Sequence, residues 1–174
     1  MKPQHRKIFF LIGASGAGKT TAAKCLEKMG LTDLQICYSD RSGVPSPDEM
    51  IKRYGSGEEW QRANTKKWVE QIKREYLNKK DVLLDSQTRP VFIDEACQKQ
   101  GINSYEIILF DCPDEIRRQR LSERGQPELA NEQMMNWAKY LREACDTDSC
   151  KILDTGDLSI DQSAHALKRY LNRR

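Results

Sequence analysis

The sequence contains no long hydrophobic run. No segment of its 174 residues approaches the roughly 18 consecutive apolar residues of a membrane span. Near the N-terminus, the basic stretch MKPQHRK is followed by only five apolar residues, IFFLI. The hydrophobic region of a signal peptide needs about 7–15 such residues. These absences predict a protein with no membrane partner that is located in the cytoplasm.

The sequence also lacks the closely spaced cysteines of a metal site. Its six cysteines include no Cys-x-x-Cys pair, and its two histidines lie far from them in sequence. Cys37, Cys112 and Cys150 lie in or beside apolar runs, which predicts buried free thiols in a reducing compartment. Cys145 and Cys150 are close enough in sequence to form a disulfide or to join a metal site, and the spacing alone does not decide between these.

A strong excess of one charge is absent as well. The formal net charge of +3 is too small to indicate a nucleic-acid-binding surface by itself. Apolar residues make up 38% of the chain and charged residues 32%, which predicts a soluble protein rich in exposed helix. No internal repeat or low-complexity linker divides the chain, so residues 1–174 are expected to form a single domain.

Short apolar segments alternate with helical patterns along the chain. Nearly continuous apolar runs of this length predict the buried strands of a parallel sheet covered on both faces. The predicted strands are Lys7–Ile12, Leu34–Ser39, Asp81–Asp85, Tyr105–Asp111 and Cys150–Asp154. The predicted helices are Lys19–Met29, Ser46–Tyr54, Glu58–Asn78, Pro90–Gln100, Pro113–Arg124, Glu128–Ala144 and Ser159–Asn172. The alternation predicts a three-layer α/β fold, with inserts at about 45–78 and 125–145 as candidate mobile parts.

The most specific motif lies where the first strand meets the first helix. Residues 13–20, GASGAGKT, match the pattern G-x-x-x-x-G-K-[ST] completely. Glycines let successive backbone N–H groups turn inward around a phosphate, and the next helix points its positive N-terminal end at the same anion. In this motif Lys19 reaches the β- and γ-phosphates and the Thr20 hydroxyl binds Mg²⁺. The predicted ATP-binding residues are Gly13, Ala14, Ser15, Gly16, Ala17, Gly18, Lys19, Thr20 and Thr21.

Two further segments supply charges that complement a triphosphate. Asp85 ends the apolar run of DVLLDSQTRP, so Thr20 and Asp85 are the predicted Mg²⁺ residues, Asp85 acting through water. In DEIRRQRLSERG, Arg117, Arg120 and Arg124 fall near one face of a helix. Close arginines repel one another unless an anion lies between them. This indicates Arg120 and Arg124 as phosphate or base contacts, although a solvated charged helix has the same pattern.

Four segments together resemble the nucleoside-monophosphate-kinase-like branch of P-loop kinases, which includes adenylate, gluconate and shikimate kinases. They are GASGAGKTT, DSQTRP, RQRLSER and ILDTGDLSIDQ, and the resemblance extends from Lys7 to about Leu167. It implies a P-loop NTPase fold with a five-stranded parallel sheet, a helical acceptor-binding insert and a short helical lid. It also implies that Arg89 holds an anionic group of the acceptor and that Arg120 clamps the nucleotide. Thr155, Gly156 and Asp157 are then expected near the adenine.

The chain departs from the family in two places. DSQTR lacks the glycine of the related stretch and the proline before its arginine, which weakens the inference for Arg89. The segment after Arg124, GQPELANEQMMNWAKYLREA, contains no zinc-type lid and predicts a short helical one. Arg124, Lys139 or Arg142 is expected to contact the transferring phosphoryl group; for Lys139 and Arg142, a charged outer helix face is the alternative.

The end of the second predicted strand bears on the acceptor. Asp40 and Arg41 follow this strand at the carboxyl edge of the sheet, where ligands of open α/β folds bind. A hydroxyl acceptor needs a carboxylate that takes its proton, which favours Asp40 as a base. Arg41, Arg53 and Arg89 favour an acceptor that carries an anion. A turn-forming role for Asp40 before a Ser-Gly loop remains an alternative.

These features predict an ATP-dependent phosphotransferase that moves the γ-phosphoryl group to a hydroxyl of an anionic small molecule. The predicted catalytic residues are Lys19, Asp40, Arg89, Arg120 and Arg124. A nucleoside monophosphate kinase is the close alternative, and a nucleotide-regulated switch without an acceptor is the alternative of another class. A nucleic-acid-end kinase is less favoured, because acidic residues interleave with the lysines and arginines of residues 66–80. The oligomeric state stays open.

Overall fold

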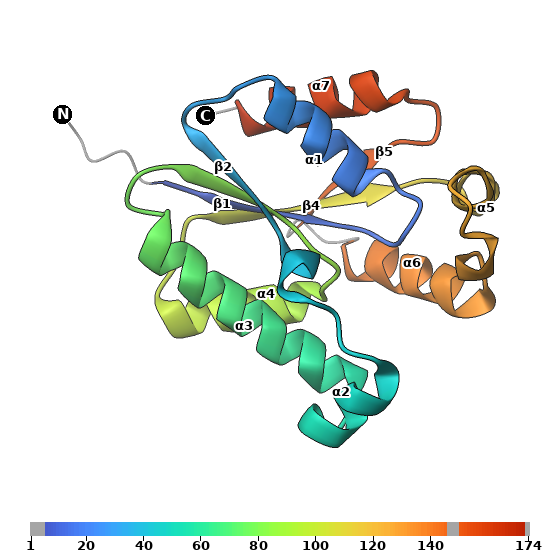
Figure 1. Ribbon diagram of the computed structural model, residues 1–174. Coiled ribbons are helices and arrows are strands. Elements are labelled where there is room, and N and C mark those ends of the chain that lie inside the picture. The colour runs from blue at the N-terminus through green and yellow to red at the C-terminus, as the bar shows by residue number, and fades with distance from the viewer. Residues whose placement is uncertain (1–5, 146–149, 173–174) are drawn as a thin grey trace.

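A five-stranded parallel sheet, in the order β2-β3-β1-β4-β5, lies at the centre of the molecule (Figure 1). The computed structural model describes residues 6–145 and 150–172. Its strands are β1 (Ile8–Ile12), β2 (Leu34–Tyr38), β3 (Asp81–Asp85), β4 (Tyr105–Asp111) and β5 (Cys150–Asp154). Each predicted strand is therefore confirmed to within one residue at either end. All carboxyl ends of the strands lie at one edge of the sheet, because every pairing is parallel.

Helices connect the strands and cover both faces of the sheet (Figure 1). They are α1 (Lys19–Lys28), α2 (Pro47–Tyr54), α3 (Gly57–Glu75), α4 (Pro90–Gln100), α5 (Asp114–Glu123), α6 (Glu132–Ala144) and α7 (Ile160–Leu171). Short 3-10 turns occupy Ser39–Ser42 and Pro127–Leu129. Over residues 6–145 and 150–172, no helix has the length and apolar character required to cross a membrane.

The α6 helix begins four residues later than the pattern predicts, at Glu132 instead of Glu128. The Pro127–Leu129 turn comes first, and Asn131 then caps the helix by accepting a hydrogen bond of 2.9 Å from the backbone N–H of Met134. Asparagine is among the preferred residues at this position. The local cap therefore decides where the helix starts.

Two hydrophobic cores lie on opposite faces of the sheet. On one face, α1 and α7 bury residues such as Leu26 and Leu167 against Leu11 and its neighbours. On the other, α3, α4 and α6 bury residues such as Ile72 and Leu141 against the sheet. The central strand β1 is buried along its whole length. The predicted three-layer α/β fold is confirmed.

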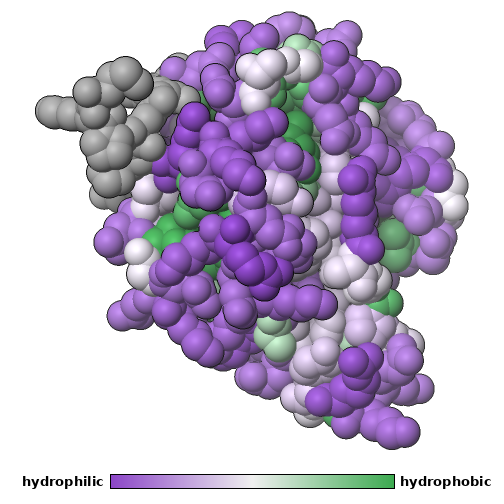
Figure 2. All heavy atoms as spheres, turned by 60° about the vertical axis from the view of Figure 1, so that its left-hand side comes forward, coloured by the Kyte–Doolittle hydropathy of each residue, from purple (hydrophilic) through white to green (hydrophobic). Residues whose placement is uncertain are grey.

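The surface is mostly hydrophilic. Figure 2 shows one face on which apolar residues occur only in small, separate patches among polar ones. Part of the edge strand β5 also reaches the surface, since Lys151, Ile152 and Asp154 are exposed. The sequence pattern wrongly predicted that β5 is buried like the other strands. It lies at the edge of the sheet, so burial of its apolar residues is only partial.

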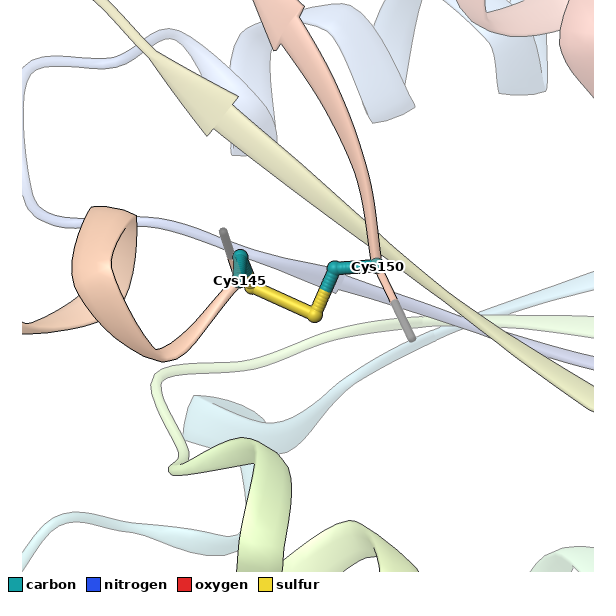
Figure 3. The surroundings of a disulfide bond; sticks show 2 residues. All are labelled: Cys145 and Cys150. Carbon is teal, nitrogen blue, oxygen red and sulfur yellow. A yellow bond between two sulfur atoms is a disulfide. The ribbon is translucent and has the colours of Figure 1, made fainter. Parts of the chain in front are cut away.

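The prediction of a free thiol is wrong for Cys150, and the disulfide that the sequence left open for Cys145 and Cys150 is present. Cys145 at the end of α6 and Cys150 at the start of β5 form a disulfide, with their Cα atoms 5.0 Å apart (Figure 3). Cys37, Cys97 and Cys112 are free and buried. The sequence predicted this for Cys37 and Cys112. Burial raises the pKa of Cys37 to about 11 and that of Cys97 to about 12, so these thiols stay protonated at neutral pH.

The second half of α6 belongs to the core. Leu141 and Cys145 are buried in the cluster formed with α3 and α4. Arg142 donates a hydrogen bond of 2.5 Å from its Nε to Oδ2 of Asp111 on β4. Movement of the whole segment 125–145 would break these contacts. We therefore propose that any closing movement is confined to residues before the middle of α6.

Replacement of Leu141 by alanine tests this assignment. The change leaves a cavity in the core and should lower the free energy of unfolding by about 2–5 kcal/mol. Glu143→Ala on the same helix is the matched control, because an exposed substitution usually changes stability by no more than about 0.5 kcal/mol. Urea denaturation followed by circular dichroism measures both. Equal stability of the two variants would show that α6 is peripheral.

Candidate active site

The glycine-rich loop between β1 and α1 has backbone conformations that favour glycine. Gly16 and Gly18 have φ angles of 86° and 89°. At Gly16, a Cβ atom would also lie 2.9 Å from Cγ of Arg117. A larger residue at this position would therefore push the loop away from α5. The open cradle predicted from the motif depends on this close approach.

Lys19 lies across the loop that precedes it. Its side chain is only 7% exposed, and its Nζ donates a hydrogen bond of 2.7 Å to the carbonyl of Gly13. Burial lowers the pKa of Lys19, while the nearby Asp85 carboxylate opposes this shift. An anion bound beside the Lys19 ammonium would offset the cost of burying its charge. The position fits the predicted contact with the β- and γ-phosphates.

Thr20 and Asp85 meet at the carboxyl edge of the sheet. Oγ1 of Thr20 donates a hydrogen bond of 2.5 Å to Oδ2 of Asp85, and burial raises the pKa of Asp85. Oγ of the neighbouring Ser86 is buried without a hydrogen-bond partner. These hard oxygen atoms suit Mg²⁺. Residues 6–145 and 150–172 contain no cluster of three or more His, Cys, Asp or Glu that could hold a metal.

A cavity of about 550 Å³ lies on the other side of the loop, between α5 and the start of α7. Arg120 forms part of its wall and donates hydrogen bonds to the carbonyl of Thr155 at 2.5 Å and of Gly156 at 3.4 Å. Thr155 in turn donates to the carbonyl of Ala17 in the loop at 2.8 Å. The structure thus brings the predicted adenine-contacting segment to the phosphate loop. None of Thr155, Gly156 and Asp157 lines this cavity: Thr155 is buried and Asp157 is exposed.

Arg117 and Arg120 of α5 and Arg124, which follows the helix, lie in different environments. Arg117 is completely buried, so the alternative of a solvated helix face is wrong for it. It pairs with Asp111 at 2.9 Å and donates to the carbonyl of Ser15 at 3.0 Å. Arg124 is exposed, lines the 550 Å³ cavity and lies near enough to Lys19 to lower its pKa.

The other two candidate lid cations have carboxylate partners. Arg142 pairs with Asp111, and Lys139 lies 3.8 Å from Glu143 on the exposed side of α6. Of the three cations considered for the phosphoryl group, Arg124 is therefore the one placed beside the phosphate loop.

Asp40 lines a cavity of about 340 Å³ together with Lys19 and Asp85. It is exposed within the 3-10 turn that follows β2. Sequence reasoning missed the rest of this wall, which comes from α3 and from the segment after β3: Trp60, Gln61, Asn64, Ser86 and Gln87. The spacing of Trp60, Gln61 and Asn64 along one helix face was the available signal, but no motif distinguishes these residues from a surface helix.

The arginines that suggested an anionic acceptor do not surround this cavity. Arg41 packs over the ring of Tyr38 at 4.3 Å, and Arg53 lies 5.6 Å from the ring of Tyr54. Neither lines the cavity that contains Asp40. Arg89 lies at a neighbouring cavity, where it already has a carboxylate partner in Glu58, 3.4 Å away.

Comparison with known proteins identifies the fold. A family model described as an AAA domain matches residues 10–137. An unliganded sugar kinase from Janibacter sp. has a TM-score of 0.67 and 19% identity, and the match covers 96% of this chain and 95% of that one. A shikimate kinase from Acinetobacter baumannii, in complex with shikimate, has a TM-score of 0.60 and 17% identity, with 97% and 95% coverage. At these identities the likeness establishes the fold, which is the one that the motifs predict.

Replacement of Lys19 by alanine tests the phosphate cradle. Loss of this cation should weaken the binding of a non-hydrolysable ATP analogue by about 10–100-fold, since hydrogen bonds to charged groups contribute about 1.5–3 kcal/mol each. Lys24→Ala, an exposed lysine on the same helix, should bind as the wild type does. Isothermal titration calorimetry measures both. Unchanged affinity of the Lys19 variant would contradict the assignment of the cradle.

Replacement of Asp85 by asparagine tests the metal site. The change removes a negative charge of the expected Mg²⁺ shell and should raise the Mg²⁺ concentration for half-maximal ATP-analogue binding by about tenfold. Binding in EDTA serves as the control and should not weaken, because no metal is then held. A Mg²⁺ titration curve that does not move would mean that Asp85 has no part in metal binding.

Proposed function

Because the chain belongs to the AAA domain family and has the fold of the nucleoside-monophosphate-kinase-like branch of P-loop kinases, we propose an enzymatic function. The protein is an ATP-dependent phosphotransferase that moves the γ-phosphoryl group to a hydroxyl of a small molecule. One observation carries this proposal: the Asp40 carboxylate lines the same cavity as Lys19 and Thr20 of the phosphate loop. A hydroxyl bound in that cavity would lie between a base and the transferring group.

Each residue of the nucleotide side then has a defined task. The loop from Gly13 to Thr21 binds the phosphates. Arg120, held by buried Thr155, forms part of the wall against which the adenine lies. Thr20 and, through water, Asp85 would hold Mg²⁺, which would offset negative charge on the phosphates. Arg124 contacts the γ-phosphoryl group and stabilises the charge that develops on it.

Asp40 has the task on the acceptor side. Phosphoryl transfer depends mostly on positioning and charge stabilisation, but a hydroxyl nucleophile must also lose its proton. Asp40 is exposed to the cavity and follows the end of β2, so it faces an acceptor without first breaking a buried contact. A nucleoside monophosphate would need free arginines for its phosphate, and Arg89 is paired with Glu58. The hydroxyl acceptor is therefore the better-supported alternative.

A switch protein without an acceptor fits the structure less well. The cavity beside Asp40 has a volume of about 340 Å³, within the range of small-molecule sites. It lies between the phosphate loop and α3, where a bound molecule would reach the γ-phosphoryl group. A switch would have no use for this second cavity.

Replacement of Asp40 by asparagine tests the proposed chemistry. The change keeps the size of the side chain and removes the base, so kcat with a hydroxyl acceptor should fall by about 10²–10⁴-fold. The affinity for ATP should stay near that of the wild type. Asp48→Asn, an exposed aspartate on α2, should leave kcat unchanged.

The measurement is ADP release over a panel of sugars, cyclitols, nucleosides and nucleoside monophosphates. A near-normal kcat of the Asp40 variant with a phosphate acceptor would support the nucleoside monophosphate kinase instead. Absence of ADP release with every acceptor would reject the phosphotransferase function for this panel and favour a binding protein.

A further inference from the structure

The cavity that contains Asp40 continues into a second, larger cavity. The first has a volume of about 340 Å³ and the second about 680 Å³. Gln61 of α3 and Gln87 after β3 line both cavities, so the two meet at these side chains. An acceptor whose hydroxyl lies beside Asp40 therefore has room for a second ring beyond the two glutamines.

The charged side chains of the second cavity neutralise each other. Glu58 and Arg89 are its acidic and basic residues, and they lie 3.4 Å apart. Nη1 of Arg89 also donates a hydrogen bond of 2.7 Å to Oε1 of Gln61. A negative group on the acceptor would have to displace Glu58 from Arg89 before it gained an ion pair. An uncharged acceptor leaves this pair intact.

Amide side chains form much of the polar wall. They come from α3, from the segment after β3 and from the start of α6: Gln61, Gln87, Asn131, Gln133 and Asn136. Gln61, Gln87 and Asn131 each use part of their amide in hydrogen bonds within the protein. An amide has two N–H donors and a carbonyl acceptor, so donors or acceptors remain at this wall. This combination matches hydroxyl groups, which both donate and accept. The polar part of the cavity therefore favours a molecule with several hydroxyls.

A stacked aromatic pair forms another part of the wall. Trp137 and Tyr140, about one turn apart on α6, stack with their ring centroids 5.5 Å apart and their planes at 12°. Both line the second cavity. The Arg89 guanidinium lies 5.1 Å from the Trp137 ring and 5.4 Å from the Tyr140 ring, which holds the two rings in place. Only a ring face that neither the other ring nor Arg89 covers is open, and such a face suits a flat ring or the apolar face of a sugar.

We propose that the acceptor is an uncharged glycoside with two rings. Its hydroxyl-bearing sugar ring lies beside Asp40, and its second, flat ring lies against Trp137 and Tyr140. This inference rests on the proposed phosphotransferase function and adds the class of the acceptor. The hydroxyl oxygen bonds to the γ-phosphorus, and the bond between that phosphorus and the β–γ bridging oxygen breaks to release ADP. The hydroxyl proton passes to the Asp40 carboxylate.

Matched probes test the class of the acceptor. Phenyl β-D-glucoside, phenyl β-D-galactoside, uridine and adenosine are neutral two-ring probes, glucose has one ring, and phenyl β-D-glucuronide and uridine monophosphate carry a negative charge. Calorimetry in the presence of Mg²⁺ and a non-hydrolysable ATP analogue should find one neutral two-ring probe that binds at least about tenfold more tightly than its charged counterpart and than glucose. If no neutral probe is preferred, the inference is wrong.

Two variants locate the binding. Trp137→Ala should lower the affinity for the preferred two-ring probe by about tenfold and leave the affinity for glucose unchanged. Glu143→Ala on the same helix should change neither affinity. Glu58→Gln frees Arg89. It should raise the affinity for the charged counterpart by about tenfold and have little effect on the affinity for the neutral probe. Equal affinity of the wild type and the Trp137 variant for every probe would overturn the placement of the second ring.

ADP release with the same probes separates this inference from the proposed function. Binding of a neutral probe that depends on Trp137, without ADP release from any probe, would retain the glycoside site and reject phosphoryl transfer. ADP release with charged probes alone would retain the phosphotransferase and overturn the uncharged acceptor. A third outcome would support both the phosphotransferase function and the glycoside acceptor. In it, the preferred neutral probe gives ADP release, and Trp137→Ala raises KM without changing kcat.

Discussion

The buried guanidinium of Arg117 is the interaction on which the rest of the site depends. It lies beneath the phosphate loop and donates to the carbonyls of Ala14 at 3.4 Å and Ser15 at 3.0 Å. Because these carbonyls are bound from below, the opposite side of the loop is left to its N–H groups, which are the groups that a phosphate needs. The close contact with Gly16 follows from the same arrangement.

Burial of this cation requires a carboxylate, and Asp111 supplies it at the end of β4. An ion pair in the interior needs further hydrogen bonds to offset its desolvation cost. The two Nη atoms of Arg117 donate to the carbonyls of Ser15 and Cys112, whereas its Nε is buried without a partner. Asp111 additionally binds Arg142 of α6, and its backbone carbonyl accepts from the N–H of Thr155 at 2.8 Å. One carboxylate thus joins the phosphate loop, the α6 helix and the segment around Thr155.

The two sides of the active site differ in how they are built. On the nucleotide side, fixed backbone and buried charges create a site suited to a triphosphate, whatever the acceptor. On the acceptor side, the wall comes from exposed or half-buried side chains of α3 and α6, such as Gln61 and Trp137. Trp137 also packs against the hydrophobic core. We propose that the side chains of this wall decide the chemical class of the acceptor.

The sequence by itself determined the strands, the order of the helices and the phosphate loop, because periodic burial and backbone freedom are local properties. It also indicated Asp85 and Asp40, since parallel strands bring their carboxyl ends to one edge. Only the tertiary structure decided that Arg117 is buried, that Arg89 is neutralised by Glu58 and that Cys145 bonds to Cys150. These outcomes depend on which side chains of distant segments come together. The sequence alone does not distinguish a charged residue that faces water from one that faces a carboxylate or a ligand.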